Sequence, residues 1–488
     1  MPPRVLLALA AALALTGAGG RAATASPRAP TVRMIFGGDV MLGRGVARLA
    51  KAEPNAVFAG IRFELGSADI AIANLESPLT VRAHEWSHGP NALEARPGSA
   101  RILAQAGFDA MAIANNHAGD AGPDTVSDTM RALAGAHLGV IGAGDPTAAY
   151  APLVLRANGL RIAFLSFDDT GEGPHASPAK PGVARWDRAL VRGAVGRARA
   201  EADIVVVGLH GGSDYNPTTD PRLLSLGRLL STWGADVVWG SGPHVVQPTK
   251  VIRGSTGRTT ILATSLGNLV FDQSIPGTRS GELLEVLAGA GGVRAYRLGA
   301  TAQTSIGAVE FSKWRSPVGN AAALEGEWWT LVSPVRPAAS REPSLRGLPV
   351  EHVVSAATGD PVGDGGRQVA VAFWRPYRRT AVNAVIRRSL LVDDRGLTNH
   401  VGIYRPDGHE LWVAGTVLQP VRKLAACDGS LAVVYSRLDR PRVIAADAWI
   451  WRGFGFAPIP DLAGPGVPTC SDVDGDGRLD PVILGRRT

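Results

Sequence analysis

Residues 31–44 read TVRMIFGGDVMLGR and join a short apolar run to a polar turn. The run Val32–Phe36 is mostly large and apolar, which is typical of a buried β-strand. Gly37, Gly38 and Asp39 follow at once, so the strand is predicted to end in a turn that carries a carboxylate. Because open α/β sheets bind ligands outside the carboxyl ends of their strands, this stretch predicts the first strand of such a sheet and a ligand site at its end.

The same order of strand and polar cluster recurs as far as residue 314. Helical stretches rich in alanine and leucine, such as 126–134 and 223–233, lie between the apolar runs, which is the pattern of an α/β domain. Further strands are predicted at 70–73, 110–113, 162–166, 204–209, 237–239 and 260–263. Polar clusters follow at 74–76, 115–117, 210–212 and 240–244.

Single members of these clusters have ordinary structural explanations. Asp39 could cap a helix, Glu76 could be a surface carboxylate, and His210 or His244 could be a buried histidine. Together with Asn116 they supply one oxygen or imidazole donor after each of five strands. Such a set can hold divalent metal that activates water and neutralises phosphate charge, so we expect a metal site.

Six motifs in this region resemble the CapA-like, or poly-gamma-glutamate capsule biosynthesis, family of the calcineurin-like metallophosphoesterase superfamily. They are GGDVMLGR (37–44), ANLESPLT (73–80), AIANNHAGDAG (112–122), GLHGGSDY (208–215), GSGPHVVQP (240–248) and SLGNLVFDQ (265–273). The resemblance covers about residues 31–290. It implies a metallophosphoesterase-like layered-sheet α/β domain over residues 31–314.

The resemblance also implies roles for single residues. Asp39 would bind a first metal, Glu76 would bridge, Asn116 and His210 would bind a second metal, and His244 would return to the first. His117 would stand beside the substrate, where as imidazolium it could stabilise charge or protonate a leaving group. His117 and Asp39 are thus the expected catalytic residues. Residues in supporting or substrate-contacting positions would be Arg44, Asn115, Asp120, Asp214, Tyr215 and Asn268. Of these, Arg44, Asp120, Asp214 and Asn268 could equally have a turn or surface role.

Two positions depart from the superfamily pattern. Met41 and Gly242 stand where the superfamily has histidine ligands, so each proposed metal loses one ligand. Fewer imidazoles lower the affinity for zinc-like ions. We therefore expect one or two ions of manganese or a similar divalent metal and not a tight di-zinc centre.

The rest of the chain predicts a different architecture. Residues 315–347 are rich in proline and indicate a linker, and residues 348–488 carry short strands at 368–374, 431–435 and 481–484 after Asp/Gly-rich turns. Their spacing of about 50 to 60 residues predicts a smaller all-β, propeller-like repeat domain. Three such units are too few for an ordinary closed propeller.

The last of these turns, 472–480, has the pattern of a calcium loop. Acidic residues alternate along it and Gly477 stands at the sixth position, but Ile483 replaces the bidentate glutamate of an EF-hand. The predicted calcium residues are Asp472, Asp474, Asp476, Arg478 and Asp480. With strand-like flanks, the loop resembles those of FG-GAP or VCBS repeats. Cys427 and Cys470 occupy similar places in successive repeats and are a candidate disulfide.

The first 25 residues have the layout of a secretory signal peptide. Arg4 precedes an apolar run, 5–15, and Ala23–Ala25 has the small residues of a signal-peptide cleavage site. We expect an exported protein that is periplasmic, cell-surface or secreted, without a stable membrane span in its mature form. Removing Arg4 and Arg21 lowers the formal charge from +7 to +5. The remaining arginines are scattered without interleaved aromatic residues, so no nucleic-acid binding is expected.

Three functions remain open from the sequence. The first is the biosynthesis or handling of poly-gamma-glutamate or another capsule polymer, with an anionic polymer as ligand and capsule export or ligase proteins as partners. The second is a metal-dependent phosphoesterase unrelated to capsule. The third is a cell-surface binding protein led by its repeat domain.

Overall fold

The computed structural model describes most of the chain. The described residues are 30–82, 93–122, 124–253, 258–304, 307–315, 320–324, 327–332, 337–338, 343–376, 397–414, 417, 419–436, 444–463, 466–473 and 477–485. The expected signal peptide, 1–25, lies outside them, as do Asp474 and Asp476 of the expected calcium loop.

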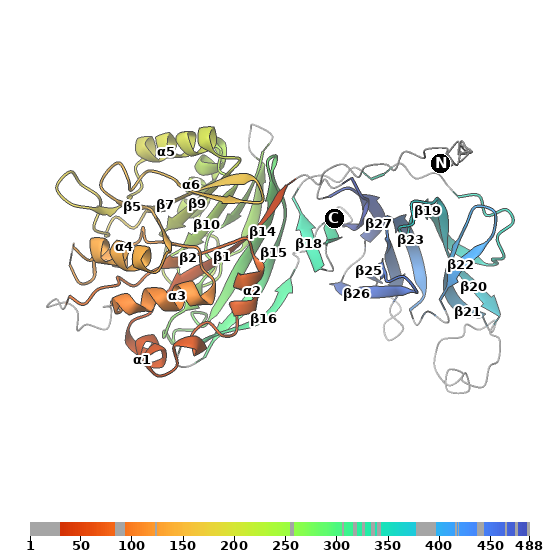
Figure 1. Cartoon of the computed structure of the whole chain (residues 1–488), viewed down its shortest axis with the longest axis horizontal. Coiled ribbons are helices and arrows are strands. Elements are labelled where there is room, and N and C mark those ends of the chain that lie inside the picture. The colour runs from red at the N-terminus through yellow and green to blue at the C-terminus, as the bar shows by residue number, and fades with distance from the viewer. Residues whose placement is uncertain are drawn as a thin grey trace, which may run out of the picture.

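The N-terminal part contains two sheets that pack face to face (Figure 1). The first contains the parallel strands β1 (Thr31–Val40), β2 (Ile70–Leu75), β3 (Ala110–Ala112) and β4 (Gly139–Ile141), with β13 (Asn268–Val270), β14 (Ser280–Gly289), β15 (Gly292–Gln303) and β16 (Val309–Arg315). The second runs β11 (Thr249–Arg253), β12 (Thr259–Ala263), β10 (Val237–Ser241), β9 (Ile204–His210), β7 (Leu160–Asp168) and β6 (Leu153–Ala157). A small pair joins β5 (Ala143–Gly144) to β8 (Gly182–Val183).

Helices cover the outer faces of both sheets. Against the first lie α1 (Arg44–Ala52), α2 (Arg62–Ser67), α3 (Ala100–Ala106) and α4 (Thr125–Gly135), with short 3-10 turns η1 (Pro54–Ala56), η2 (Pro97–Ser99) and η3 (Asn116–Gly119). Against the second lie α5 (Arg188–Glu201) and α6 (Pro221–Trp233). The predicted layered α/β fold is confirmed by this arrangement. Its central strands are covered on both faces, which explains why their sequences are continuously apolar.

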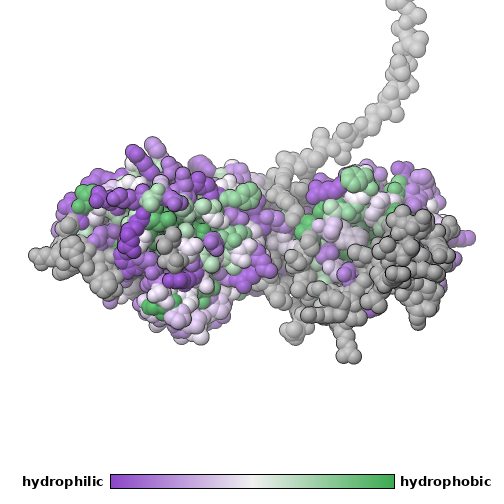
Figure 2. Space-filling model, turned by 90° about the horizontal axis from the view of Figure 1, so that it is seen from below, coloured by the Kyte–Doolittle hydropathy of each residue, from purple (hydrophilic) through white to green (hydrophobic). Residues whose placement is uncertain are grey.

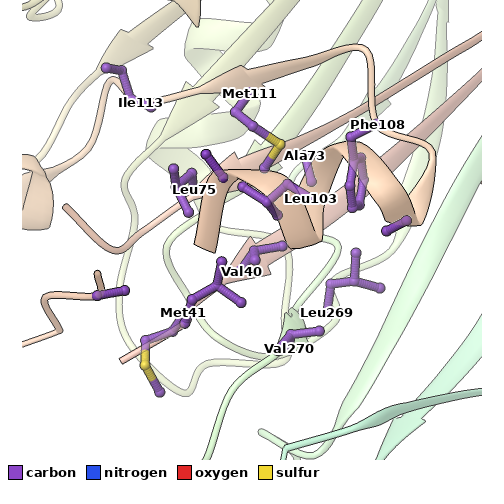
Figure 3. Packing of buried hydrophobic residues seen from close by; sticks show 14 of the residues in the cluster. Val40, Met41, Ala73, Leu75, Leu103, Phe108, Met111, Ile113, Leu269 and Val270 are labelled. Carbon is purple, nitrogen blue, oxygen red and sulfur yellow. The ribbon is translucent and has the colours of Figure 1, made fainter. Parts of the chain in front are cut away.

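Three hydrophobic cores hold these layers together. Phe36 of β1 stacks on Trp239 of β10 between the sheets, with ring centroids 5.3 Å apart. On the outer face of the first sheet, Leu103 of α3 packs over buried residues of β2 and β3 (Figure 3).

The boundaries of α6 follow from its sequence: Asp220 accepts hydrogen bonds from the first-turn backbone, and Gly234 ends the helix with a φ of 113°.

The C-terminal region consists of four-stranded antiparallel units. The first comprises β19 (Val353–Gly359), β20 (Gln368–Pro376), β21 (Leu397–Tyr404) and β22 (Glu410–Val413). The second comprises β23 (Val421–Cys427), β24 (Ser430–Ser436), β25 (Ile444–Trp451) and β26 (Phe456–Ala463). The predicted all-β region after the α/β domain is thereby confirmed, and the three predicted strands coincide with β20, β24 and β28.

The third unit combines segments far apart in the sequence. The hairpin β27 (Gly466–Ser471) and β28 (Asp480–Gly485) continues into β17 (Ala321–Leu324) and β18 (Glu327–Leu331). These two strands lie inside the segment expected to be an irregular linker, so that expectation is corrected for 321–331. The physical reason is burial: Ala322 and Trp329 pack with Val482 of β28.

A partly buried charge network joins this unit to the α/β domain. β18 pairs with β15, and Glu327 on β18 lies 2.9 Å from Arg297 on β15. Arg297 also forms an ion pair with buried Glu285 of β14, and its guanidinium contacts the ring faces of Trp314 and Trp329, at 4.3 and 4.7 Å from their centroids. The two regions are therefore joined by packed side chains as well as by the chain.

Cys427 and Cys470 form a disulfide, with 5.5 Å between their Cα atoms. The bond links the end of β23 to β27, so it joins the second unit to the third. Nearby, Asp428 accepts a hydrogen bond from the Leu479 backbone at 2.8 Å. The end of the expected calcium loop thus contacts the second unit, and the disulfide holds the strand that precedes the loop.

Among the described residues, no helix is long and apolar enough to cross a membrane. On the face shown in Figure 2, hydrophilic residues are spread over the α/β domain between smaller hydrophobic areas.

Candidate functional site

The polar clusters meet at one edge of the two sheets. Asp39 lies near the end of β1 and Glu76 follows β2, while His210 ends β9 and His244 follows β10. The two carboxylates come from the first sheet and the two histidines from the second. Their ionisable atoms lie 3.6 to 3.9 Å apart in the pairs Asp39–His244, Asp39–His210 and Glu76–His244. The predicted convergence of strand ends is present in the fold.

Asp39, Glu76 and His244 form a group with the geometry of a metal site. Each is buried and offers one ligand atom, and these atoms all lie within 4.8 Å of one another. Two carboxylates and an imidazole are donors that manganese and similar divalent ions accept. Asn116 and His210 form a separate pair beside this group.

Two neutral donors fix the carboxylate of Asp39. Asn74 Nδ2 donates to Oδ1 at 2.7 Å, and the Gly242 backbone N–H donates to Oδ2 at 3.1 Å. Asn115 in turn donates to Asn74 Oδ1 at 3.1 Å and so extends the network. Hydrogen bonds of this kind orient a metal-binding carboxylate and leave its remaining lone pairs free.

Asn268 determines which nitrogen of His244 faces the site. The Asn268 amide donates to Gln273 Oε1 and to the Thr278 carbonyl, so its Oδ1 is the atom that faces His244 Nδ1, at 2.9 Å. Nδ1 must then carry the proton. The lone pair of Nε2 is therefore directed to the side where Glu76 Oε1 lies 3.8 Å away.

The surroundings of Glu76 indicate whether the group Asp39, Glu76 and His244 fits a cation. Its Oε2 atom is buried and has no hydrogen-bond partner among the described residues. Burial raises the pKa of Glu76 well above its usual range, and the nearby carboxylate of Asp39 raises it further. A buried carboxylate oxygen without a donor is costly, and a divalent cation would satisfy it. The residues present fit such an ion.

His210 and Asn116 lie together as expected for ligands of a second ion. His210 Nε2 is 3.0 Å from Asn116 Oδ1, and Nδ1 is 2.9 Å from Ser241 Oγ. Burial lowers the pKa of His210, which favours its neutral form. Both ring nitrogens thus have partners within the protein, and a second ion would have to replace the bond to Asn116.

Met41 and Gly242, which stand where the resemblance implies histidine ligands, are fixed by core packing and by backbone conformation. Met41 is buried in the hydrophobic core beside Val40 and Val270 (Figure 3). Gly242 has a φ of 112°, and a Cβ atom there would lie 2.7 Å from the Gly211 carbonyl oxygen. A histidine at 242 would therefore clash with backbone, so the protein cannot provide the ligand that the superfamily has there.

His117 stands beside the group and is oriented by a carboxylate. Its Nδ1 lies 3.0 Å from Asp120 Oδ2, and its Nε2 lies 3.8 Å from Glu76 Oε1. The Asp120 carboxylate only accepts, so the Nδ1 proton points to it and Nε2 faces the site. This is the arrangement of an oriented acid or base.

The remaining predicted residues line the surroundings. Tyr215 stacks on His244 with ring centroids 5.9 Å apart and is partly exposed, and Asp214 beside it is exposed. Burial raises the pKa of Tyr215, and the charge of Asp214 raises it as well. Arg44 forms an ion pair with Asp272, so its charge is directed to that residue.

Sequence reasoning missed several residues at this edge. Asn74 belongs to the predicted polar cluster 74–76 but carries no predicted role, although it holds both Asp39 and Asn115. Ser241 and Asp168 also end strands, β10 and β7. Their position at a strand end is the one sequence feature that could have indicated them. Serine and single aspartate residues are too common at that position to be predicted as site residues from it.

The fold and the site define a class: layered α/β proteins with carboxylate, amide and imidazole donors collected at the strand ends. Residues 33–273 match the family model described as "Bacterial capsule synthesis protein PGA_cap". The predicted resemblance to the CapA-like family is therefore confirmed for residues 33–273.

Two relatives carry names from this family. The PGA biosynthesis protein CapA of Bacillus subtilis is 32% identical over 255 residues, which are 51% of this chain and 66% of that relative. The capsule biosynthesis protein CapA of Bacillus anthracis is 29% identical over 262 residues, 52% of this chain and 62% of that relative. The matches thus span a little under two thirds of these relatives.

Among solved structures, a hypothetical protein from Thermus thermophilus is similar, with a TM-score of 0.36, 20% identity and coverage of 56% of this chain and 100% of that one. The NAD nucleotidase of Haemophilus influenzae has a TM-score of 0.33, 9% identity and coverage of 63% and 54%.

Proposed function

We propose that the chain is an exported CapA-like protein that handles an anionic capsule polymer at a cleft holding a divalent ion. The observation that carries the proposal is the buried group Asp39, Glu76 and His244, in which Glu76 Oε2 has no hydrogen-bond partner among the described residues. The name of the Bacillus subtilis relative refers to PGA biosynthesis and that of the Bacillus anthracis relative to capsule biosynthesis, and both support a capsule polymer such as poly-gamma-glutamate as the ligand. The leader pattern in residues 1–25 supports export.

The residues around the group have distinct tasks in this proposal. A bound ion would supply charge neutralisation for an anionic oxygen and would make water more acidic. Asn74 and Asn268 hold Asp39 and His244 in the geometry that accepts the ion. His117, oriented by Asp120, holds a proton at the site or gives it to a departing oxygen. Capsule export or ligase proteins are the proposed partners.

A second candidate function is a phosphoesterase unrelated to capsule. The observation that favours it is the pair of His117 and Asp120, because a surface that only binds polymer does not need an oriented imidazole beside a metal. The same cleft would serve this chemistry with His117 protonating the leaving oxygen.

The C-terminal loop is proposed to bind calcium. Asp472 accepts a hydrogen bond from the Gly477 backbone and Asp480 accepts one from the Val473 backbone, so these two carboxylates close the turn. Calcium favours such oxygen-rich loops. Calcium titration of the full chain against Asp480→Asn would test this proposal, with weaker binding expected in the variant.

The experiment on the main proposal uses the manganese-loaded full chain with two probes: bis-p-nitrophenyl phosphate and a gamma-linked glutamate oligomer. Asp39→Asn should abolish metal-dependent effects on both. Loss of His117 should lower any turnover by about 10² to 10⁴ while oligomer binding persists. His409→Gln, in an exposed turn between β21 and β22, is the control. A wild-type chain that holds manganese but acts on or binds neither probe would contradict the proposal.

A further inference from the structure

A second carboxylate and imidazole pair stands outside the group described above. Asp168 ends β7 and is buried, and its Oδ2 lies 3.1 Å from Nε2 of His175. The other oxygen, Oδ1, accepts from the backbone N–H and the hydroxyl of Thr170, at 3.0 and 2.7 Å. Both carboxylate oxygens are thus engaged.

This pairing fixes the orientation of His175. The Asp168 carboxylate only accepts, so Nε2 carries the proton that it receives. Nδ1 is then the ring atom left for a ligand, and it has no hydrogen-bond partner within the described part of the chain. The side chain is 23% exposed, so a dissolved ligand can reach it.

The loop that carries His175 packs against the candidate site. A Cβ atom on Gly173 would lie 2.9 Å from the Asn115 carbonyl oxygen, and one on Gly119 would lie 2.9 Å from Pro174. Asn115 and Gly119 flank the segment that contains His117. Asp168 is also the register partner of His210 in the pairing of β7 with β9.

We propose that His175 is a ligand-contacting residue of the cleft and that Asp168 is its positioning residue. In the protonated ring both nitrogens donate, Nε2–H to the Asp168 carboxylate and Nδ1–H to a bound oxyanion. His117 with Asp120 and His175 with Asp168 are then two imidazoles, each oriented by a carboxylate, at the same edge. The inference rests on the proposed function, because it requires the metal cleft beside it. The ligand class is an oxyanion, either a phosphate or the carboxylate of an acidic polymer.

The test measures anion binding by calorimetry on the manganese-loaded full chain, with inorganic phosphate in one arm and a gamma-linked glutamate oligomer in the other. His175→Gln should weaken binding of the true ligand class roughly tenfold, the size expected for a hydrogen bond to a charged group. Asp168→Asn should act in the same direction while manganese content stays at the wild-type level. His409→Gln, exposed and in another region, should change neither.

The outcomes separate this inference from the proposed function. Weaker binding in only one arm identifies the oxyanion source and supports the role of His175. Equal binding by wild type and His175→Gln in both arms overturns it, and so does a metal-loaded wild type that binds neither anion. Failure of the wild type to take up manganese would instead count against the proposed function, and thermal melting of each variant shows whether it has folded.

Discussion

Asn268 Oδ1 lies 2.9 Å from Nδ1 of His244, while the other ring nitrogen, Nε2, faces Glu76. This contact makes Asn268 the residue that selects the tautomer of a proposed metal ligand. Residues that orient a metal-bound imidazole are worth about 10- to 100-fold in metal affinity. Asn268→Ala should weaken manganese binding by that factor.

Equilibrium dialysis at several manganese concentrations measures this effect. Asn268→Asp, which keeps an acceptor toward His244, should lose less affinity than Asn268→Ala. Unchanged affinity in Asn268→Ala, with the fold intact by circular dichroism, would show that the contact does not orient the site.

Gly242 should not tolerate a side chain. Its φ of 112° and the close Gly211 carbonyl predict that Gly242→Ala lowers the free energy of unfolding by about 1–3 kcal/mol, measured by urea denaturation. Gly196→Ala is the matched control, because it lies in the interior of α5 with open space around it and should raise stability by about 0.5–1 kcal/mol. Equal stability of the two variants would contradict the backbone argument.

The disulfide should stabilise the C-terminal units. It spans 43 residues, and closing a loop of that length contributes about 2–4 kcal/mol. The double variant Cys427→Ser and Cys470→Ser should therefore melt at lower temperature. A reducing agent should lower the wild-type melting temperature and leave the variant unchanged. A variant as stable as the oxidised wild type would show that the bond contributes nothing.

The charge network between the α/β domain and β18 predicts a strong effect of a single change. Glu285→Ala removes the buried one of the two carboxylates that pair with Arg297 and leaves Glu327, so the cost should approach but not exceed the roughly 3–5 kcal/mol of a fully broken buried pair. The paired change Glu285→Leu with Arg297→Met should recover most of that loss. Chemical denaturation of both variants tests this, and equal losses in both would contradict the pairing.

The strand-end donors could be predicted from the sequence because each follows an apolar run directly. Asp39, Glu76 and His244 come from strands whose order in the sheets the sequence does not reveal, yet parallel strands bring their ends to one edge in any order. The disulfide candidate likewise followed from the similar positions of Cys427 and Cys470.

Other features depended on tertiary contacts that no local pattern carries. β17 and β18 lie in a proline-rich stretch and become strands because Trp329 and Ala322 pack against the C-terminal hairpin. The role of Asn74 depends on its distance to Asp39, and that of Gly242 on the approach of Gly211. Spacing in the sequence contains neither distance.

The most direct test of the central claim, that Asp39, Glu76 and His244 hold a divalent ion, is elemental analysis of the manganese-dialysed full chain beside the double variant Asp39→Asn with His244→Ala. The wild type should retain about one manganese ion more per chain than the variant, whatever calcium either protein holds. Equal manganese content in two folded proteins would contradict it.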